Sequence, residues 1–237
     1  MNLTTVRRVL ISALILAVIV SLIGCGGDKK DAPVSTNTPA KSTATQEEPI
    51  QSIFAKAKQT PGMTYDSVVT MKEMTLNSRV WAERGKVKME QTVQGRKSVM
   101  YFDGEDMYQY DPASNLAMKF SMKGMEGKGP RKPDAVDYTE HMVPDSMKVI
   151  ENVVYDGVKC RVISYTMKGS DGTVKMWVRE DYGLPMRTEM TTKDGEKIVT
   201  ENKNMKIGAL PPETFNLPAG VQIKDMSEMM KRLPQKP

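Results

Sequence analysis

The side chains that could do chemistry in this chain are few and lie far apart. The sequence holds one histidine, His141, and two cysteines, Cys25 and Cys160. A single histidine cannot form a His-based metal cluster or acid–base pair within one chain. No nucleophile elbow, phosphate-binding glycine loop or paired-cysteine zinc spacing occurs. We therefore predict no catalytic residue, metal or cofactor, and a protein that is not an enzyme; a carboxylate-based hydrolase is the alternative that nothing in the sequence favours.

Methionine is the unusual component, with 20 residues against 4 phenylalanines and 2 tryptophans. Thioether groups can bind Cu(I), and the spaced groups are Met71 with Met74, Met122 with Met125, and Met226 with Met229 and Met230. Residues three apart on a strand point to opposite faces, so most of these groups do not converge and a copper site is not predicted. Methionine also fills irregular apolar space and adapts to variable partners, which suits ordinary core packing or an adaptable cavity.

The first 25 residues indicate export. Arg7 and Arg8 precede an uncharged apolar run over 9–23, which is the layout of a secretory signal peptide. The run of about 15 residues is shorter than the ~20 that a transmembrane helix needs, which disfavours the alternative of a plain membrane anchor. Its end, Leu22-Ile23-Gly24-Cys25, resembles the lipobox of bacterial lipoproteins. That resemblance implies that Cys25 becomes the first mature residue and carries lipid, of the diacylglycerol and palmitate type.

Composition divides the chain into three parts. We predict a lipoprotein signal peptide over 1–24, a lipidated cysteine with a disordered tether over 25–46, and a folded domain over 47–237. The formal net charge of +5 is mild and its basic residues are interspersed with acidic ones, so nucleic acid is not indicated as a partner. Cys160 lies in an apolar strand-like run, and we predict that it is buried in the core.

The domain is predicted to be mainly β with a few helices. Apolar residues at helical spacing predict a helix over 47–59, and shorter helices are predicted over 134–142 and 227–233, with a loop over 123–133 between elements. Period-two alternation predicts strands over 63–74, 77–83, 86–93, 98–103, 106–110, 116–122, 147–155, 158–167, 173–179, 184–190 and 197–207. Asp-Gly pairs at 103–104, 156–157, 171–172 and 194–195 predict hairpin turns. About ten strands joined by hairpins give one curved sheet or partial barrel.

Several segments together resemble the LolA/LolB-like superfamily. They are Ser78 to Glu90 with its tryptophan and basic turn, Tyr101-Phe102-Asp103-Gly104, Met107 to Pro112, and the terminal Pro211 to Val221. The resemblance implies a half-open antiparallel β-barrel of about 11 strands with covering helices, whose cavity binds acyl chains of lipoproteins or lipids. Where the lipidated acceptor type carries an apolar loop, this chain has the polar turn 94–97, so a general carrier role is favoured.

We therefore expect a lipid-anchored lipoprotein of the cell envelope that binds lipid acyl chains or lipoproteins, as carrier or sensor. Its location would be the outer face of the plasma membrane, or the periplasmic side of the outer membrane in a diderm. The alternative is a protein-interaction module of the same fold with a filled cavity, serving an envelope or spore-cortex enzyme. The candidate cavity-lining residues are Trp81, Val87, Met89, Val99, Met176, Val178, Met186 and Met190.

Overall fold

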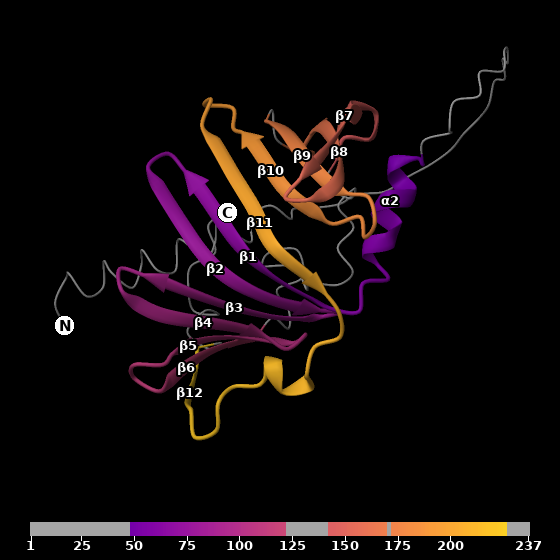
Figure 1. Cartoon of the computed structure of the whole chain (residues 1–237). Coiled ribbons are helices and arrows are strands. Elements are labelled where there is room, and N and C mark those ends of the chain that lie inside the picture. The colour runs from indigo at the N-terminus through magenta and orange to yellow at the C-terminus, as the bar shows by residue number, and fades with distance from the viewer. Residues whose placement is uncertain (1–47, 122–141, 170–171, 227–237) are drawn as a thin grey trace, which may run out of the picture.

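The computed structural model describes residues 48–121, 142–169 and 172–226, and these form one 12-stranded sheet with a single α-helix against it (Figure 1). Across the sheet the strands follow the order β12-β6-β5-β4-β3-β2-β1-β11-β10-β9-β8-β7. In chain order the strands are β1 (Met63–Met71), β2 (Met74–Glu83), β3 (Lys86–Val93), β4 (Arg96–Phe102), β5 (Asp106–Asp111), β6 (Leu116–Ser121), β7 (Lys148–Tyr155), β8 (Val158–Thr166), β9 (Thr173–Arg179), β10 (Pro185–Thr191), β11 (Lys197–Ile207) and β12 (Gln222–Asp225).

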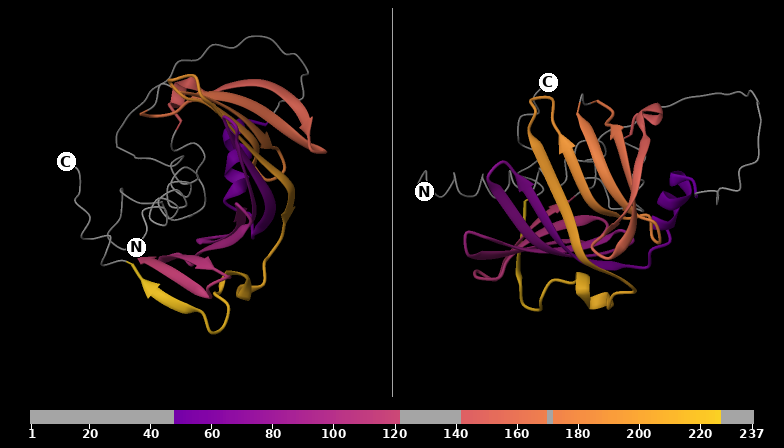
Figure 2. Two further views of the ribbon diagram at one scale, coloured as in Figure 1. Left: turned by 90° about the vertical axis from the view of Figure 1, so that its left-hand side faces the viewer. Right: turned by 45° about the horizontal axis from the view of Figure 1, so that its top comes forward.

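The sheet is open and strongly curved. Neighbouring strands pair antiparallel, and β1 joins the two halves of the sheet by pairing with β11 on one side and β2 on the other. Only β12 runs parallel to its neighbour, β6. Figure 2 shows the sheet as a trough with one concave and one convex side. The half-open antiparallel architecture predicted from the sequence is therefore confirmed.

The α-helix, α2 (Ile50–Ala57), lies on the concave side of the sheet (Figure 2). Ile50, Ile53 and Phe54 are its buried residues, and they pack against apolar side chains of β8 and β9. Their spacing of three and four residues puts them on one helical face. This is the helix predicted over 47–59, shorter at both ends. No helix within the described ranges is long and apolar enough to cross a bilayer.

Hairpin turns account for most of the connections. At the β7–β8 turn, Asp156 and Gly157 have φ of 51° and 74°, the positive values that an Asp-Gly hairpin requires. One turn was missed: the sequence predicts a strand over 63–74, but the chain turns at Lys72, whose φ is 50°. No glycine marks this turn, which is why the pattern hid it.

The remaining differences lie at the ends of the chain and around one internal segment. Strand β12 and the short 3₁₀ helices Pro144–Ser146 and Pro212–Phe215 were not predicted. The predicted loop over 123–133 and the predicted helix over 227–233 lie outside the described residues, as does nearly all of the predicted helix over 134–142. The Asp-Gly pair at 171–172 is described only at Gly172.

Candidate functional site

The two faces of the sheet differ in chemistry. Residues directly opposite each other on paired strands share a face, and successive residues alternate between faces. Following the pairing from strand to strand places every methionine of the strands on the concave face. These are Met63, Met71, Met74, Met89, Met100, Met107, Met118, Met176, Met186, Met190 and Met205.

The concave face is also an environment of low polarity. Met89 of β3 lies directly opposite Met100 of β4, and Met89 is buried. On the same face, burial raises the pKa of Tyr65 to about 12 and that of Tyr165 to about 12. Removal from water disfavours the charged phenolate, so these shifts mark a weakly solvated surface.

Helix α2 is fixed to one end of this face by polar contacts as well as by apolar packing. Lys56 Nζ donates a hydrogen bond to the Glu180 carbonyl oxygen at 2.8 Å. The buried Arg161 guanidinium of β8 donates to the Glu48 carbonyl oxygen, just before the helix, and to Glu180 Oε1 at 3.0 Å. The Lys56 and Glu48 contacts join the helix and its entry to the β9–β10 turn and to β8, and the Arg161–Glu180 contact ties β8 to that turn. Helix α2 therefore covers that end of the trough as an anchored element.

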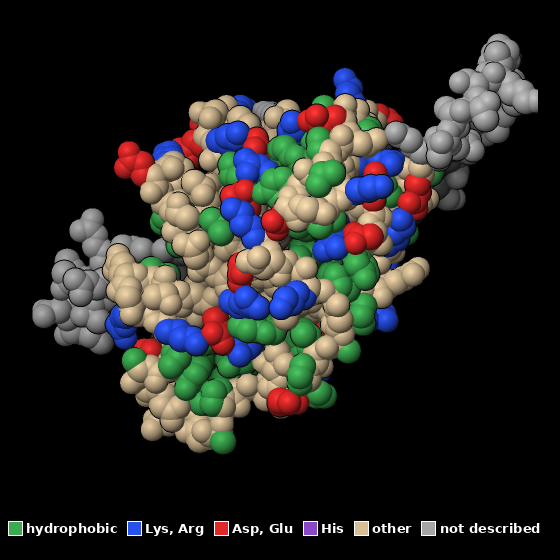
Figure 3. Space-filling view, viewed as in Figure 1, with side chains coloured by type: hydrophobic (Ala, Val, Ile, Leu, Met, Phe, Trp, Pro, Cys, Tyr) green, Lys and Arg blue, Asp and Glu red, His purple; other side chains and the backbone are tan. Residues whose placement is uncertain are grey.

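The convex face carries most of the ion pairs. Charged partners face each other there across neighbouring strands, as in Arg79 with Asp66 at 2.9 Å and Arg187 with Glu201 at 2.9 Å. Figure 3 shows lysine and arginine side chains interspersed with aspartate and glutamate over this side of the molecule. A hydrogen bond from Tyr155 lowers the pKa of Glu201, with Lys203 and Arg187 acting in the same direction. At these pairs the convex face is therefore solvated and charged, with no excess of one sign.

The structure divides the sequence-predicted lining residues between the two faces. Six lie on the concave face: Val87, Met89, Met176, Val178, Met186 and Met190. Trp81 and Val99 lie on the convex face, because they stand opposite Lys88 and Glu90 respectively. The side chains of a strand form two alternating sets, one on each face of the sheet. The sequence alone does not tell which set faces inward when both contain large apolar residues.

The six residues are not one contiguous group. Met176 and Val178 are buried beneath α2, with Met190 packed against the same cluster. Val87 and Met89 belong to β3, four strands away from β10 in the sheet order. The sequence analysis missed other concave residues, such as Met100 and Met107. The face on which each of them lies follows from that of Met89 once the β3–β4 turn is placed.

Trp81 and Val99 have structural partners on the convex face. Lys88 Nζ lies 4.6 Å from the centre of the Trp81 ring, and the Arg79 guanidinium lies 5.7 Å from it. Val99 packs in a second buried cluster with Tyr101, Tyr110 and Ala117. The C-terminal segment covers this cluster through Leu217 and Val221. That segment seals one end of the convex face and excludes Val99 from the trough.

Of the two cysteines and the histidine, only Cys160 lies within the described residues. Cys160 is a free thiol with 1% of its surface exposed, which confirms the predicted core position. Burial raises the pKa of its thiol to about 11, so it is an unreactive thiol at neutral pH. Cys25 and His141 lie outside the described residues. Within the described ranges no group of three or more histidine, cysteine or carboxylate side chains converges on a metal position.

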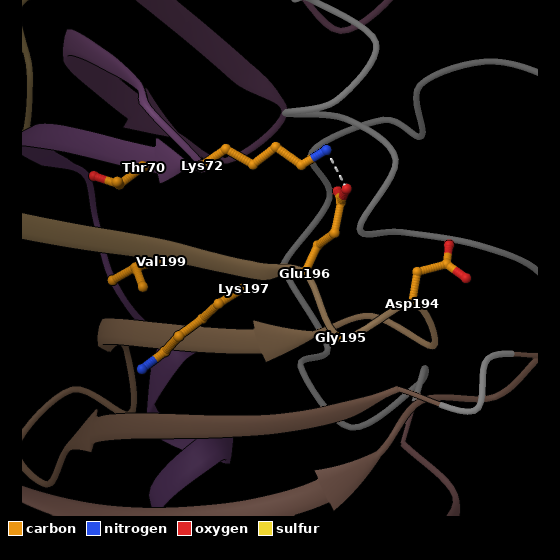
Figure 4. A pocket seen from close by; sticks show the side chains of 7 residues that line it. All are labelled: Thr70, Lys72, Asp194, Gly195, Glu196, Lys197 and Val199. Atoms are coloured by element: carbon orange, nitrogen blue, oxygen red, sulfur yellow. Dashed lines mark ion pairs between the residues drawn. The ribbon is translucent and has the colours of Figure 1, made fainter.

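A shallow depression of about 440 Å³ lies between the tips of the β1–β2 and β10–β11 hairpins (Figure 4). Its lining is Thr70, Lys72, Asp194, Gly195, Glu196, Lys197 and Val199. The Lys72 ammonium pairs with the Glu196 carboxylate across it. It contains none of the predicted lining residues and its lining is mostly charged, so the concave face is the better candidate site for an apolar ligand.

Comparisons with known proteins identify the fold. No family model matches the sequence, and no curated protein matches it. Among solved structures, an uncharacterised conserved protein from Thermus thermophilus matches with 13% identity and a TM-score of 0.51, over 74% of this chain and 98% of that one. MucB of Pseudomonas aeruginosa, in its complex with MucA, matches with 13% identity and a TM-score of 0.50, over 74% of this chain.

This chain spans 62% of the MucB chain, so the match concerns part of that protein. A LolA superfamily protein from Nitrosomonas europaea also matches, with 15% identity and a TM-score of 0.37, over 71% of this chain and 97% of that one. The class of fold defined by the structure is an open, curved antiparallel sheet. At these identities the likeness is one of fold.

Proposed function

We propose that this protein is a lipid-anchored lipoprotein of the cell envelope whose concave face binds the acyl chains of lipids or of other lipoproteins. The observation that carries the proposal is the separation of the two faces, with every strand methionine on the concave side and most ion pairs on the convex side. Flexible thioether side chains adapt to chains of different length and shape. Burial of acyl methylenes contributes roughly 0.8 kcal/mol each, which is the driving force for binding.

The N-terminal part of the proposal rests on sequence. Residues 1–24 would be removed on export, Cys25 would carry the lipid, and 26–46 would tether the domain that begins near residue 47. Several acyl chains hold a protein stably at a bilayer, whereas one holds it marginally. The domain would then take up or sense acyl chains close to the membrane that holds it, and its role is binding rather than catalysis.

Native mass spectrometry tests the proposal on the chain that begins at residue 26, which lacks its own lipid. We expect bound lipid after purification, or on titration with an acyl lipid such as dioleoylglycerol. The variant Met107→Asp puts a charge on the concave face. Its matched control is Tyr108→Asp, which puts the same charge on the convex face. A chain without bound lipid in either experiment would overturn the proposal.

A second candidate function is a protein-interaction module of the same fold. Strand β7 lies at the edge of the described sheet, and Val149, Ile150 and Val154 are exposed on it. Exposed apolar edge strands are sites where another chain can add a strand. The structure of MucB with MucA is a protein complex of a similarly folded chain. A partner whose binding is lost on Val154→Lys, from a protein without bound lipid, would favour this reading.

A further inference from the structure

A row of uncharged polar side chains crosses the concave face at right angles to the strands. Each member stands directly opposite the next on the neighbouring strand, so the line passes through five adjacent strands, β11 to β4. The row consists of Asn202 (β11), Ser67 (β1), Ser78 (β2), Gln91 (β3) and Ser98 (β4). Gln109 of β5 extends it, because its Nε2 donates a hydrogen bond to Ser98 Oγ.

Apolar residues border this row on both sides along the strands. Val80 and Met89 lie on one side, and Val69 and Leu76 lie on the other; each has less than a tenth of its surface exposed. Ser67 in the row is itself buried to the same degree. Hydroxyl and amide groups placed among buried apolar side chains are costly unless they find hydrogen-bond partners. Within the row, Asn202 Nδ2 already donates to the Pro185 carbonyl oxygen at 3.0 Å, and Ser78 Oγ donates to the Ser67 carbonyl oxygen at 3.5 Å. A ligand with polar groups at the matching depth would add acceptors for the Ser67 hydroxyl and the Gln91 amide.

The row carries no charge. Arg96 and Asp111 border its β4–β5 end on the same face, two residues from Ser98 and Gln109, and they pair with each other at 3.1 Å. The Arg161–Glu180 pair lies at β8 and the β9–β10 turn. Among the described residues, the cation nearest to the row is Arg96, which Asp111 already neutralises, so a phosphate group in the row would leave water without an unpaired cation. Neutral carbonyl oxygens face no such penalty, since serine hydroxyls and side-chain amides can donate to them.

We propose that the row from Asn202 to Gln109 binds the ester groups of a neutral acyl glyceride, with the acyl chains on the apolar residues to either side. This inference rests on the proposed function and adds the chemical class of the ligand. It distinguishes a diacylglycerol, whose esters can accept hydrogen bonds from the row, from a plain hydrocarbon and from an anionic phospholipid.

The test uses the full lipidated chain anchored in phosphatidylcholine vesicles. The vesicles hold one of three photoactivatable probes with a diazirine at the same chain position: a diacylglycerol, an alkane or a phosphatidylglycerol. We expect the diacylglycerol to label concave strands more strongly than the phosphatidylglycerol. Ser67→Ala and Gln91→Met should each reduce diacylglycerol labelling about fivefold to tenfold, the effect of one lost hydrogen bond, and leave alkane labelling unchanged.

Thr92→Val is the matched control, because Thr92 follows Gln91 on β3 and faces the convex side. Labelling by all three probes should be the same in this variant as in the wild type. Thermal unfolding checks that each variant is folded. Two outcomes would overturn ester binding by the row while leaving acyl binding intact. One is unchanged diacylglycerol labelling in both row variants, and the other is an equal fall in diacylglycerol and alkane labelling in folded variants. Equal labelling by diacylglycerol and phosphatidylglycerol would overturn the preference for a neutral lipid. Labelling by none of the probes would overturn the proposed function itself.

Discussion

Gly183 in the β9–β10 turn lies against Ile53 of α2 so closely that a Cβ atom at position 183 would stand 2.0 Å from the Ile53 carbonyl oxygen. The φ of Gly183 is +66°, which L side chains rarely adopt. Two independent constraints thus require glycine here. The contact fixes how near α2 can approach the sheet, and so how that end of the trough is covered.

Gly183→Ala should therefore destabilise the protein more than an ordinary glycine substitution. We expect a loss of about 3 kcal/mol or more in the free energy of unfolding, since backbone strain and a steric clash add. Gly157→Ala is the control, because φ is +74° there but no atom lies within 4 Å of the added Cβ; its cost should be about 1 kcal/mol. Urea denaturation measures both, and equal losses would contradict the tight α2 contact.

Tyr155 and Glu201 connect the sheet edge to its middle across the convex face. Tyr155 Oη donates to Glu201 Oε1 at 2.5 Å, and this bond is the largest cause of the lowered pKa of Glu201. A carboxyl group whose pKa is lowered by folding stabilises the protein above its ordinary pKa of 4.5, and this contribution is lost as pH falls through the lower, folded value.

Tyr155→Phe should cost about 1.5–3 kcal/mol at pH 7, the range for a hydrogen bond to a charged group. The difference from the wild type should shrink as pH falls below 4.5, because protonation removes the charge that strengthens the bond. Urea denaturation between about pH 7 and pH 3 checks this. A difference that stays constant over that range would show that the charge of Glu201 does not strengthen the hydrogen bond from Tyr155.

Cys160 should be unreactive until the protein unfolds, given its burial and a thiol pKa raised to about 11. In the Cys25→Ala chain it is the only cysteine. Reaction with a disulfide reagent at pH 7 should be slow in buffer and should accelerate with urea at the midpoint of unfolding. Rapid stoichiometric reaction without urea would place the thiol at the surface instead.

Cys25 is expected to carry the lipid anchor. Cys25→Ala should abolish incorporation of radiolabelled palmitate in a bacterial host, because the thiol that starts lipid attachment is gone. Cys160→Ala is the matched control and should retain full incorporation, since Cys160 is buried. Incorporation that persists in Cys25→Ala would refute the lipobox interpretation.

The sequence predicted the sheet well because its strands alternate clearly and most of its turns carry glycine. Lys86–Val93 and Thr173–Arg179 were predicted at the residues where the structure has them. The turn at Lys72 was missed because a non-glycine residue adopts positive φ there. Strand β12 was missed because four exposed residues, pairing with β6 far away in sequence, leave no local pattern.

The site was harder to predict than the strands. Alternation identifies two faces, but it does not say which of them is concave when both contain large apolar residues. Trp81 illustrates this: the ring is apolar, yet the cationic groups of Arg79 and Lys88 lie within 6 Å of its centre on the charged side. The polar row was also invisible in the sequence, since it exists only once the register of β11 to β5 is known.

The contact between an acyl chain and one face of the sheet can be measured at two neighbouring residues. Met107 and Tyr108 are consecutive on β5 and both half-buried; Met107 faces the concave side and Tyr108 the convex side. A benzophenone side chain placed at either position captures a bound lipid on irradiation. We predict lipid adducts from position 107 and none from position 108. Equal capture from both positions, or capture from 108 alone, would contradict acyl binding in the trough.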